Sequence, residues 1–156
     1  MLLAQRLKRC THLARACFAT EAKAPFVLRL PLLSPSFDGA RVVRWHKKVG
    51  DELTEGAPLV QLECHNLRPP DGVASEWTRM DLEIHEQCKV STILEGVGTS
   101  GSEPLPVGAP LAVLAEAGDE KATKGRTFTK DALPEPSREP LWQALRVEGA
   151  PTDGCL

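Results

Sequence analysis

The chain has 156 residues, a formal net charge of -2 and only 4% aromatic side chains. The length favours one domain with additional segments, and the composition indicates a core of small aliphatic side chains. The net charge argues against nucleic acid as an electrostatic partner, and no apolar run approaches the length of a membrane span. The five cysteines show neither disulfide-framework spacing nor a CxxC pair.

The N-terminal segment differs from the rest of the chain. It contains Arg6, Lys8, Arg9 and Arg15, whereas the first acidic residue is Glu21. A basic, amphipathic start without acidic residues is typical of a mitochondrial transit peptide. We therefore expect residues 1–24 to be a transit peptide or a basic N-terminal arm. The expected localisation is mitochondrial, in the matrix or on the matrix side of the inner membrane.

Short apolar or alternating segments separated by turn residues follow in chain order, and each predicts a β-strand. They span residues 26–31, 41–45, 59–64, 77–84, 89–94 and 111–114. In the third segment, Val60, Leu62 and Cys64 share one face, because side chains alternate along a strand. Pro69 to Gly72 is a clear loop. Many short strands separated by turns indicate a barrel or a sandwich.

One turn-plus-strand phrase occurs twice. Gly56–Leu62 reads GAPLVQL and returns as GAPLAVL in Gly108–Leu114. A glycine-containing turn precedes each copy, at residues 49–51 and 96–98. The repetition suggests a small all-β domain built from two similar halves.

The chain becomes polar and proline-rich from Gly118 onward. We expect residues 118–156 to form a C-terminal tail that contains a candidate docking segment at 137–147. Ser137 is placed to cap a short helix there, and that helix would present Leu141, Trp142 and Leu145. The alternative is a disordered tail, because so polar a segment buries little apolar surface.

Several segments resemble the lipoyl domains in the acyltransferase components of 2-oxo acid dehydrogenase complexes. The matching segments are Leu30–Ser36, Gly39–Asp51, Gly56–Glu63, Ile93–Leu94 and Pro106–Leu111. The resemblance covers residues 27–116 and implies the biotinyl/lipoyl fold, a flattened β-barrel of two small antiparallel sheets with quasi-twofold symmetry. The repeated phrase fits that symmetry independently. We therefore expect a lipoyl-like domain at residues 25–117, between flexible N- and C-terminal extensions.

The family's activity depends on a lysine that carries the lipoyl group at the tip of a β-hairpin. Alignment from the N-terminal side puts Asn66 at this position, and alignment from the C-terminal side puts Trp77 there, because about ten residues are inserted between them. No lysine occurs between Lys48 and Lys89. The resemblance therefore implies the fold without its attachment site, and we expect no cofactor and no catalytic residue.

Other motifs match known sites only in part. Cys64-His65 and His85-x-x-Cys88 contain zinc-ligand types, but a vicinal Cys-His pair is a poor chelate. Cys64 beside His65 also suggests a nucleophile with its base, although neighbouring strand side chains point to opposite faces. Gly96–Gly101 matches GxGxxG, but prolines follow where a dinucleotide site needs a helix. We expect no metal site, no catalytic pair and no dinucleotide site.

Two tryptophans stand out in a chain with so few aromatic residues. The strand position of Trp45 predicts that it caps the barrel core. Trp77 is either exposed, as an interface anchor, or partly buried against the hairpin. The candidate interface residues are therefore Trp77, Leu141, Trp142 and Leu145.

The preferred interpretation is a non-catalytic, lipoyl-like accessory or structural subunit of a large mitochondrial assembly. A respiratory complex, the ATP synthase or the mitochondrial ribosome would each provide other protein subunits as partners. The alternative is a component or binding protein of a 2-oxo acid (pyruvate) dehydrogenase complex. A third interpretation is an enzyme or acyl carrier that is modified at an atypical lysine.

Overall fold

The computed structural model describes residues 24–67, 77–98, 103–118, 124–134 and 138–147. The expected transit peptide at 1–24 lies almost entirely outside these residues. The described strands are β1 (Phe26–Arg29), β2 (Gly39–Trp45), β3 (Glu52–Leu53), β4 (Ala57–His65), β5 (Trp77–Ile84), β6 (Cys88–Ile93), β7 (Leu105–Pro106), β8 (Pro110–Glu116) and β9 (Trp142–Arg146). No helix in the described ranges is long and apolar enough to cross a membrane.

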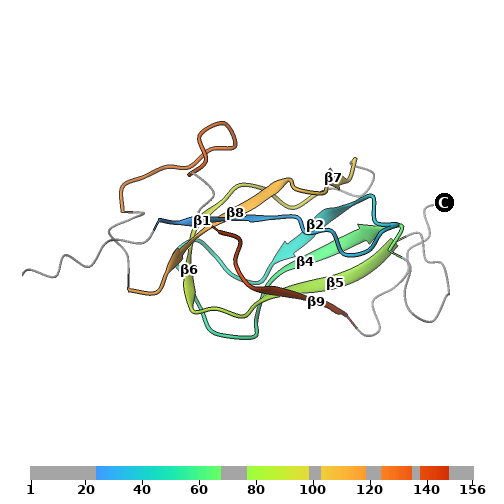
Figure 1. Ribbon diagram of the computed structural model, residues 1–156, viewed down its shortest axis with the longest axis horizontal. Helices are drawn as coiled ribbons and strands as arrows, with labels where there is room; N and C mark the ends of the chain where they lie inside the picture. The colour runs from blue at the N-terminus through green and yellow to red at the C-terminus, as the bar shows by residue number, and fades with distance from the viewer. Residues whose placement is uncertain (1–23, 68–76, 99–102, 119–123, 135–137, 148–156) are drawn as a thin grey trace, which may run out of the picture.

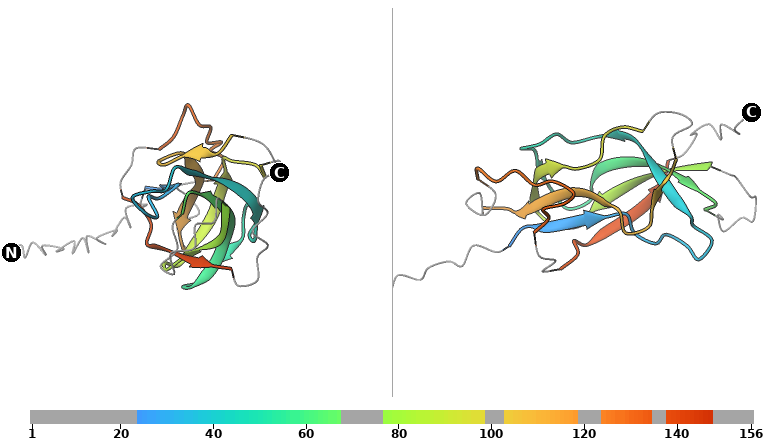
Figure 2. Two further views of the ribbon diagram at one scale, coloured as in Figure 1. Left: turned by 90° about the vertical axis from the view of Figure 1, so that its right-hand side faces the viewer. Right: turned by 90° about the horizontal axis from the view of Figure 1, so that it is seen from above.

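The strands form two antiparallel sheets that face one another in a flattened barrel (Figures 1 and 2). One sheet has the order β1-β8-β6-β3 and the other the order β7-β2-β4-β5-β9. The all-β, lipoyl-like class expected from the sequence is confirmed. The six expected strands are all present, with ends that shift by up to a few residues, whereas the two-residue strands β3 and β7 carry too little pattern to be predicted.

The repeated phrase generates a quasi-twofold relation between the sheets. β2 pairs with β4 in one sheet as β6 pairs with β8 in the other. Val42 lies opposite Leu62, Val90 lies opposite Leu114, and each ladder has a bulge immediately after the valine. A bulge bends and twists its strand, so matched bulges curve both sheets at the same place.

Hydrogen bonds from the glycine turns repeat the same relation. The Gly50 amide donates to the carbonyl of Val90, and the Gly98 amide donates to the carbonyl of Val42, both at 2.8 Å. Each half of the barrel therefore folds its turn onto the bulge of the other half. The glycine-containing segments that precede the two copies therefore make equivalent backbone contacts.

The first glycine of each copy opens the following strand in a left-handed conformation. Gly56 has φ 76° and Gly108 has φ 85°. The Gly56 amide donates to the Ile84 carbonyl at 2.9 Å, and the Gly108 amide donates to the Leu30 carbonyl at 2.8 Å. Glycine adopts positive φ without steric cost, which explains why both copies begin with it.

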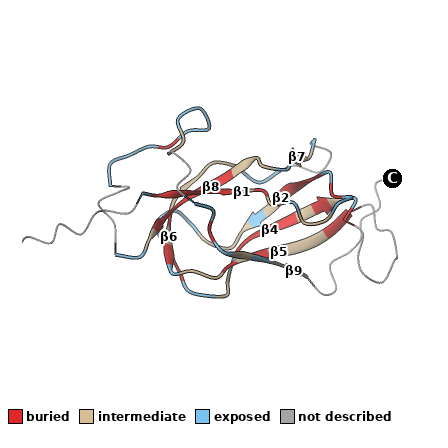
Figure 3. Ribbon diagram, in the orientation of Figure 1, coloured by how far each residue is buried: buried red, intermediate tan, exposed pale blue. Residues whose placement is uncertain are grey.

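The core fills the space between the sheets and is aliphatic, as the composition predicts (Figure 3). Its largest fully buried side chains are Phe26, Leu28, Leu30, Leu53, Leu59, Leu62, Leu82, Ile84, Leu111 and Leu114. Full burial of such a side chain contributes roughly 1.5–3 kcal/mol. Trp45 packs against the edge of this core, and its indole N–H donates to the Glu95 carbonyl at 2.9 Å. The expected capping role of Trp45 is confirmed.

The candidate docking segment 137–147 is not a helix in its described part. Residues 142–146 form β9, which pairs antiparallel with β5. Trp142 and Ala144 pack against the core, whereas Gln143 and Leu145 are exposed. This alternation has the period of a strand, and the edge of β5 supplies the backbone partners that a helix would not use. Ser137, the expected helix cap, lies outside the described residues.

Candidate functional site

The β4–β5 hairpin holds the position where the family carries lipoyl-lysine. The last ladder pair is His65 opposite Trp77, so residues 66–76 connect the strands where the family has a tight turn. Asn66 is the first residue beyond the ladder, and it is exposed with φ 54°. Asparagine is among the residues that tolerate this left-handed conformation. Of the two aligned candidates, Asn66 therefore lies just beyond the end of β4, and Trp77 is the first residue of β5.

The tip is bound to the connection between β1 and β2. The Ser36 hydroxyl donates to the Asn66 carbonyl at 3.0 Å, and the Asn66 side-chain amide donates to the carboxylate of Asp38. The Asp38 amide donates to the His65 carbonyl at 3.4 Å, and its carboxylate lies 3.3 Å from Nδ1 of His65. Two of these contacts hold Asn66 and two hold His65 at the end of β4, although each is partly exposed and therefore individually weak.

Trp77 is covered by its neighbours. The guanidinium of Arg41 lies 3.8 Å from the centre of its ring, and the His65 ring lies 4.7 Å away on the adjacent strand. Only 9% of Trp77 is exposed. Of the two readings left open by the sequence, burial against the hairpin is therefore the correct one. The role of an exposed interface anchor is wrong for Trp77, because Arg41 occupies the face that a partner would need.

A charged row lies beside Trp77. Nη2 of Arg41 lies 2.8 Å from Oε2 of Glu63, and Nε of Arg79 lies 3.4 Å from Oε1 of the same carboxylate. Glu63 thus sits between two guanidinium groups on adjacent strands. Guanidinium groups remain protonated and do not serve as acylated amines in proteins. The row links β2, β4 and β5, but it provides no primary amine for a lipoyl group.

The lysines nearest in sequence lie away from the tip. Lys48 belongs to the turn after β2, where its amide donates to Asp51 at 2.8 Å. Lys89 lies in β6 of the other sheet, opposite Glu52. Among the residues that the structure describes, no lysine takes the place of the family's lipoyl-lysine.

The two cysteines of the zinc and nucleophile readings are buried on different sheets. Burial, with Glu63 nearby, raises the pKa of Cys64 to about 12. Burial, with Glu86 nearby, raises the pKa of Cys88 to about 12. A thiol must lose its proton to bind zinc or to attack a substrate, so neither is prepared for such chemistry. In the described part of the chain, no three His, Cys, Asp or Glu side chains are grouped to hold a metal ion.

The described part of the GxGxxG match belongs to the barrel. Gly96–Gly98 follow β6 without forming a helix, and the Gly98 amide is already bonded to Val42. A dinucleotide site needs free amides at a helix N-terminus. Gly96 to Gly98 do not provide them, whereas residues 99–101 lie outside the described ranges.

Comparisons with known proteins agree with the fold, although no family model matches the chain. The chain is 34% identical over 107 residues to the dihydrolipoyllysine-residue acetyltransferase component of the mitochondrial pyruvate dehydrogenase complex of Neurospora crassa, a match that covers 68% of this chain and 20% of the relative. It is 28% identical over 120 residues to the mitochondrial pyruvate dehydrogenase complex protein X component of Saccharomyces cerevisiae, covering 75% and 26%. The chain belongs to the biotinyl/lipoyl-domain family. It spans only a fifth to a quarter of the length of these relatives.

The names of the relatives also provide evidence on the localisation and the host complex that the sequence leads us to expect. Several are mitochondrial proteins, which supports the expected mitochondrial localisation, whereas others are bacterial, as in Rickettsia bellii with 26% identity over 117 residues. All three of the named relatives belong to pyruvate dehydrogenase complexes. The preferred interpretation of a respiratory-chain, ATP synthase or ribosomal accessory subunit therefore receives no support, and the alternative is favoured.

Sequence reasoning missed the residues that bind the tip. Ser36, Asp38 and Arg41 come from the β1–β2 connection and β2, some thirty residues before the hairpin in sequence. Their contacts arise from strand register, because Gly39 lies opposite His65.

Proposed function

We propose that this chain is a component of the mitochondrial pyruvate dehydrogenase complex that uses its lipoyl-type domain for binding and carries no lipoyl group. The proposal is supported by the sequence of the β4–β5 hairpin, where the residues aligned with the modified lysine are Asn66 or Trp77 and no lysine lies between Lys48 and Lys89. The printed names of the relatives supply the complex.

The chemistry of the tip supports a binding role. A carrier domain in this family needs a primary amine on a long, exposed side chain that swings between active sites. Asn66 offers a short amide already committed to Asp38. The contacts of Ser36 and His65 hold the same backbone in place. A fixed, polar end of the barrel is suited to recognition of another protein rather than to transport of an acyl group.

We do not propose that this chain transfers acetyl groups. The matched region covers 20% of the Neurospora acetyltransferase component, so the relatives suggest the assembly and leave the chain's own reactions open. The described residues contribute no activated thiol, since burial raises the pKa of both Cys64 and Cys88 to about 12. We therefore propose a non-enzymatic component.

The candidate contact residues in and immediately before β9 fit this role better than Trp77. Leu141 is 63% exposed and Leu145 is 39% exposed, whereas Trp142 is half-buried against the core. Two exposed apolar side chains, one just before an edge strand and one within it, are a reasonable contact for another subunit. The expectation for Leu141 and Leu145 as interface residues stays a prediction.

The test is affinity isolation of the full chain from mitochondria after solubilisation in a mild detergent. Native electrophoresis with mass spectrometry of each band should place the chain in the band of the pyruvate dehydrogenase complex, and its intact mass should lack the lipoyl increment. Recovery in a respiratory, ATP synthase or ribosomal band would overturn the proposed setting. A mass that includes the increment would overturn the proposed loss of the cofactor.

A matched variant separates the missing amine from the altered tip. Asn66→Lys places a primary amine at the aligned position but keeps the long connection 66–76. We expect it to remain without lipoate, because the tip lacks the tight turn of the family. Asn66→Gln serves as the control for loss of the Asp38 contact. Lipoylation of the lysine variant would show that the residue alone separates this chain from a carrier.

A further inference from the structure

In the described residues the two sheets end in four edge strands, β1, β3, β7 and β9. Three of them are poor templates for another strand. β3 and β7 are each two residues long, and β7 contains Pro106, whereas β1 has a bulge between Leu28 and Arg29. Short strands, prolines and bulges all discourage the addition of a strand. β9 has five residues, contains neither proline nor lysine, and pairs with β5 without a register shift.

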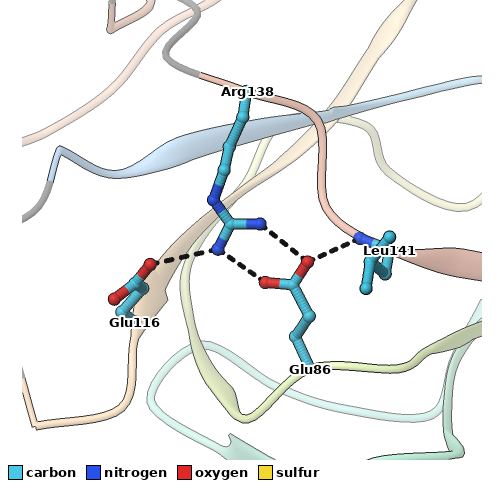
Figure 4. A network of polar contacts seen from close by, with 4 residues as sticks. All are labelled: Glu86, Glu116, Arg138 and Leu141. Carbon is cyan, nitrogen blue, oxygen red and sulfur yellow. Dashed lines mark hydrogen bonds and ion pairs between the residues drawn. The ribbon is translucent and has the colours of Figure 1, made fainter.

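A charged clamp fixes the start of the β9 segment on its own barrel (Figure 4). The Arg138 guanidinium donates from its two terminal nitrogens to the two carboxylate oxygens of Glu86, at 2.7 and 2.6 Å. The second of these nitrogens also lies 3.0 Å from Glu116, and the Leu141 amide donates to Glu86 at 2.8 Å. β9 is therefore held on its own β5 and presents its other edge outward, at the margin of the sheet (Figure 1).

The hydrogen bonds to β5 determine which backbone groups of β9 point outward. The His85 amide donates to the Leu141 carbonyl at 2.9 Å, and the Val147 amide donates to the Arg79 carbonyl at 3.2 Å. Bonded residues alternate along an antiparallel strand, so the odd-numbered residues of this segment bond to β5. The backbone amides and carbonyls that point away from β5 belong to the even-numbered residues, Trp142, Ala144 and Arg146.

The outward-pointing residues form a pattern that is its own antiparallel complement. When Ala144 lies opposite Ala144 of a second copy, Trp142 lies opposite Arg146 of that copy. In this register the outward groups of one strand meet those of the other, as a hydrogen-bonded antiparallel pair requires. Arg146 is the only charged residue of β9, so no like charges meet across the pair. A strand that matches itself in this way fits a closed, isologous dimer.

The side chains on the solvent face also match in this register. Gln143 lies opposite Leu145 of the second copy, and Leu141 lies opposite Val147. Leu141 is 63% exposed and Leu145 is 39% exposed. Pairing with a second copy therefore removes from water apolar surface that a single chain leaves exposed.

We propose that two copies of this chain associate through the outer edges of β9, antiparallel and with Ala144 on the twofold axis. Each β9 remains clamped to its own barrel, and the two five-stranded sheets become continuous. The proposal concerns the isolated chain and does not depend on the complex to which the chain belongs, so it can fail while the proposed function holds.

The first test measures self-association of the purified full chain by analytical ultracentrifugation over a concentration series. We expect an equilibrium between monomer and dimer without larger species, because twofold pairing occupies the β9 edge of both copies. A chain that stays monomeric at every concentration would overturn the proposal, even if the same edge bound a different subunit.

A double lysine variant tests whether β9 forms the contact. Gln143→Lys with Leu145→Lys places like charges opposite each other twice across the proposed pair. Within one chain, the same lysines lie opposite Glu83 and Asp81 of β5, so β9 stays in place. We expect the dimer to weaken at least about tenfold, because like charges directly opposite each other destabilise a strand pair. Unchanged hydrogen exchange at the His85 amide checks that β9 is retained, and an unchanged dimer would overturn the proposal.

A crosslink tests the register. A form with Gln143→Cys, mixed with a form with Leu145→Cys and oxidised, should give a disulfide between positions 143 and 145 of different copies. These positions form a pair without mutual backbone hydrogen bonds, in which side chains lie closest. The Gln143→Cys form alone is the control, because position 143 lies two residues out of register with itself. Peptide mapping by mass spectrometry identifies the linked residues. Equal linkage in mixture and control would overturn the proposed pairing.

Discussion

The two sheets of the barrel follow the same plan but differ at β5. The four-stranded sheet contains the second copy of the repeated phrase in β8, and the five-stranded sheet contains the first copy in β4. Their paired strands, bulges and glycine turns correspond. Both departures involve β5: the long connection 66–76 precedes it, and β9 lies along its edge.

The features that the two sheets share and the features found on only one sheet have different consequences. The features shared by both sheets build the core, whereas the five-stranded sheet alone contains the long connection 66–76 and the added strand β9. β1, the counterpart of β5, begins the barrel and has no hairpin connection to β8.

The largest expected effect tests whether equivalent core positions in the two sheets contribute equally to the free energy of unfolding. Leu62 and Leu114 are fully buried at corresponding ladder positions. We expect Leu62→Ala and Leu114→Ala each to lower the free energy of unfolding by about 2–5 kcal/mol, because truncation removes apolar burial and leaves a cavity. Urea denaturation measures both. A loss confined to one sheet would contradict the equivalence of the halves.

Each sheet contains one buried thiol, so the pH dependence of stability can be compared between the two sheets. Burial raises the pKa of Cys64 and Cys88 from 9.0 to about 12, so between these values the folded state keeps protons that the unfolded state loses. Stability from the neutral thiols is therefore complete below pH 9 and falls as pH rises toward 12, by up to about 1.4 kcal/mol per pH unit for each thiol.

The measurement is urea denaturation from pH 8 to 11, for the unmodified chain and for Cys64→Ala and Cys88→Ala. Each variant should lose stability less steeply with rising pH than the unmodified chain. The comparison cancels the lysines that titrate in the same range. Parallel curves would show that the thiols ionise as easily in the folded barrel as in the unfolded chain.

The glycine turns give a smaller, matched test. Gly56 and Gly108 both have positive φ, and a Cβ at either position meets no atom within 4 Å. Gly56→Ala and Gly108→Ala should each cost about 1–2 kcal/mol through backbone strain alone. Thermal or urea unfolding would check the two values. Tolerance of alanine at only one turn would indicate that the halves hold their turns differently.

The smallest expected effect isolates β9. Arg138→Ala removes the clamp, and we expect a loss of about 1 kcal/mol at most, because the ion pair is partly exposed. Hydrogen exchange should show faster exchange at the amides of His85 and Val147, which bond across the β5–β9 pair. The Gly50 and Gly98 amides in the barrel turns should keep their rates. Equal acceleration everywhere would mean that β9 is part of the main folding unit.

Much of the barrel follows from local sequence pattern. Strands are predicted directly by the alternation in β4 and β5 and by the repeated GAPL phrase. The structure contains these strands, and the glycines that precede them make the backbone contacts described above. The placement of Trp45 follows from its position near a strand end. These features depend on side-chain period and backbone conformation, which neighbouring residues determine.

The remainder depends on contacts between distant segments. The sequence predicts a short helix capped by Ser137 in this segment, whereas residues 142–146 pair as strand β9 with the edge of β5. Tertiary context commonly overrides local propensity for so short a segment. Trp77 is covered by Arg41 from another strand, a contact that sequence spacing does not reveal. The absent lysine, by contrast, was visible in the sequence itself.

The most direct test of the central claim is the intact mass of the endogenous chain recovered from purified mitochondrial pyruvate dehydrogenase complex. The account predicts that the chain is present in the complex and that its mass excludes any lipoyl group. Absence from the complex, or a mass that includes the lipoyl increment, would contradict it.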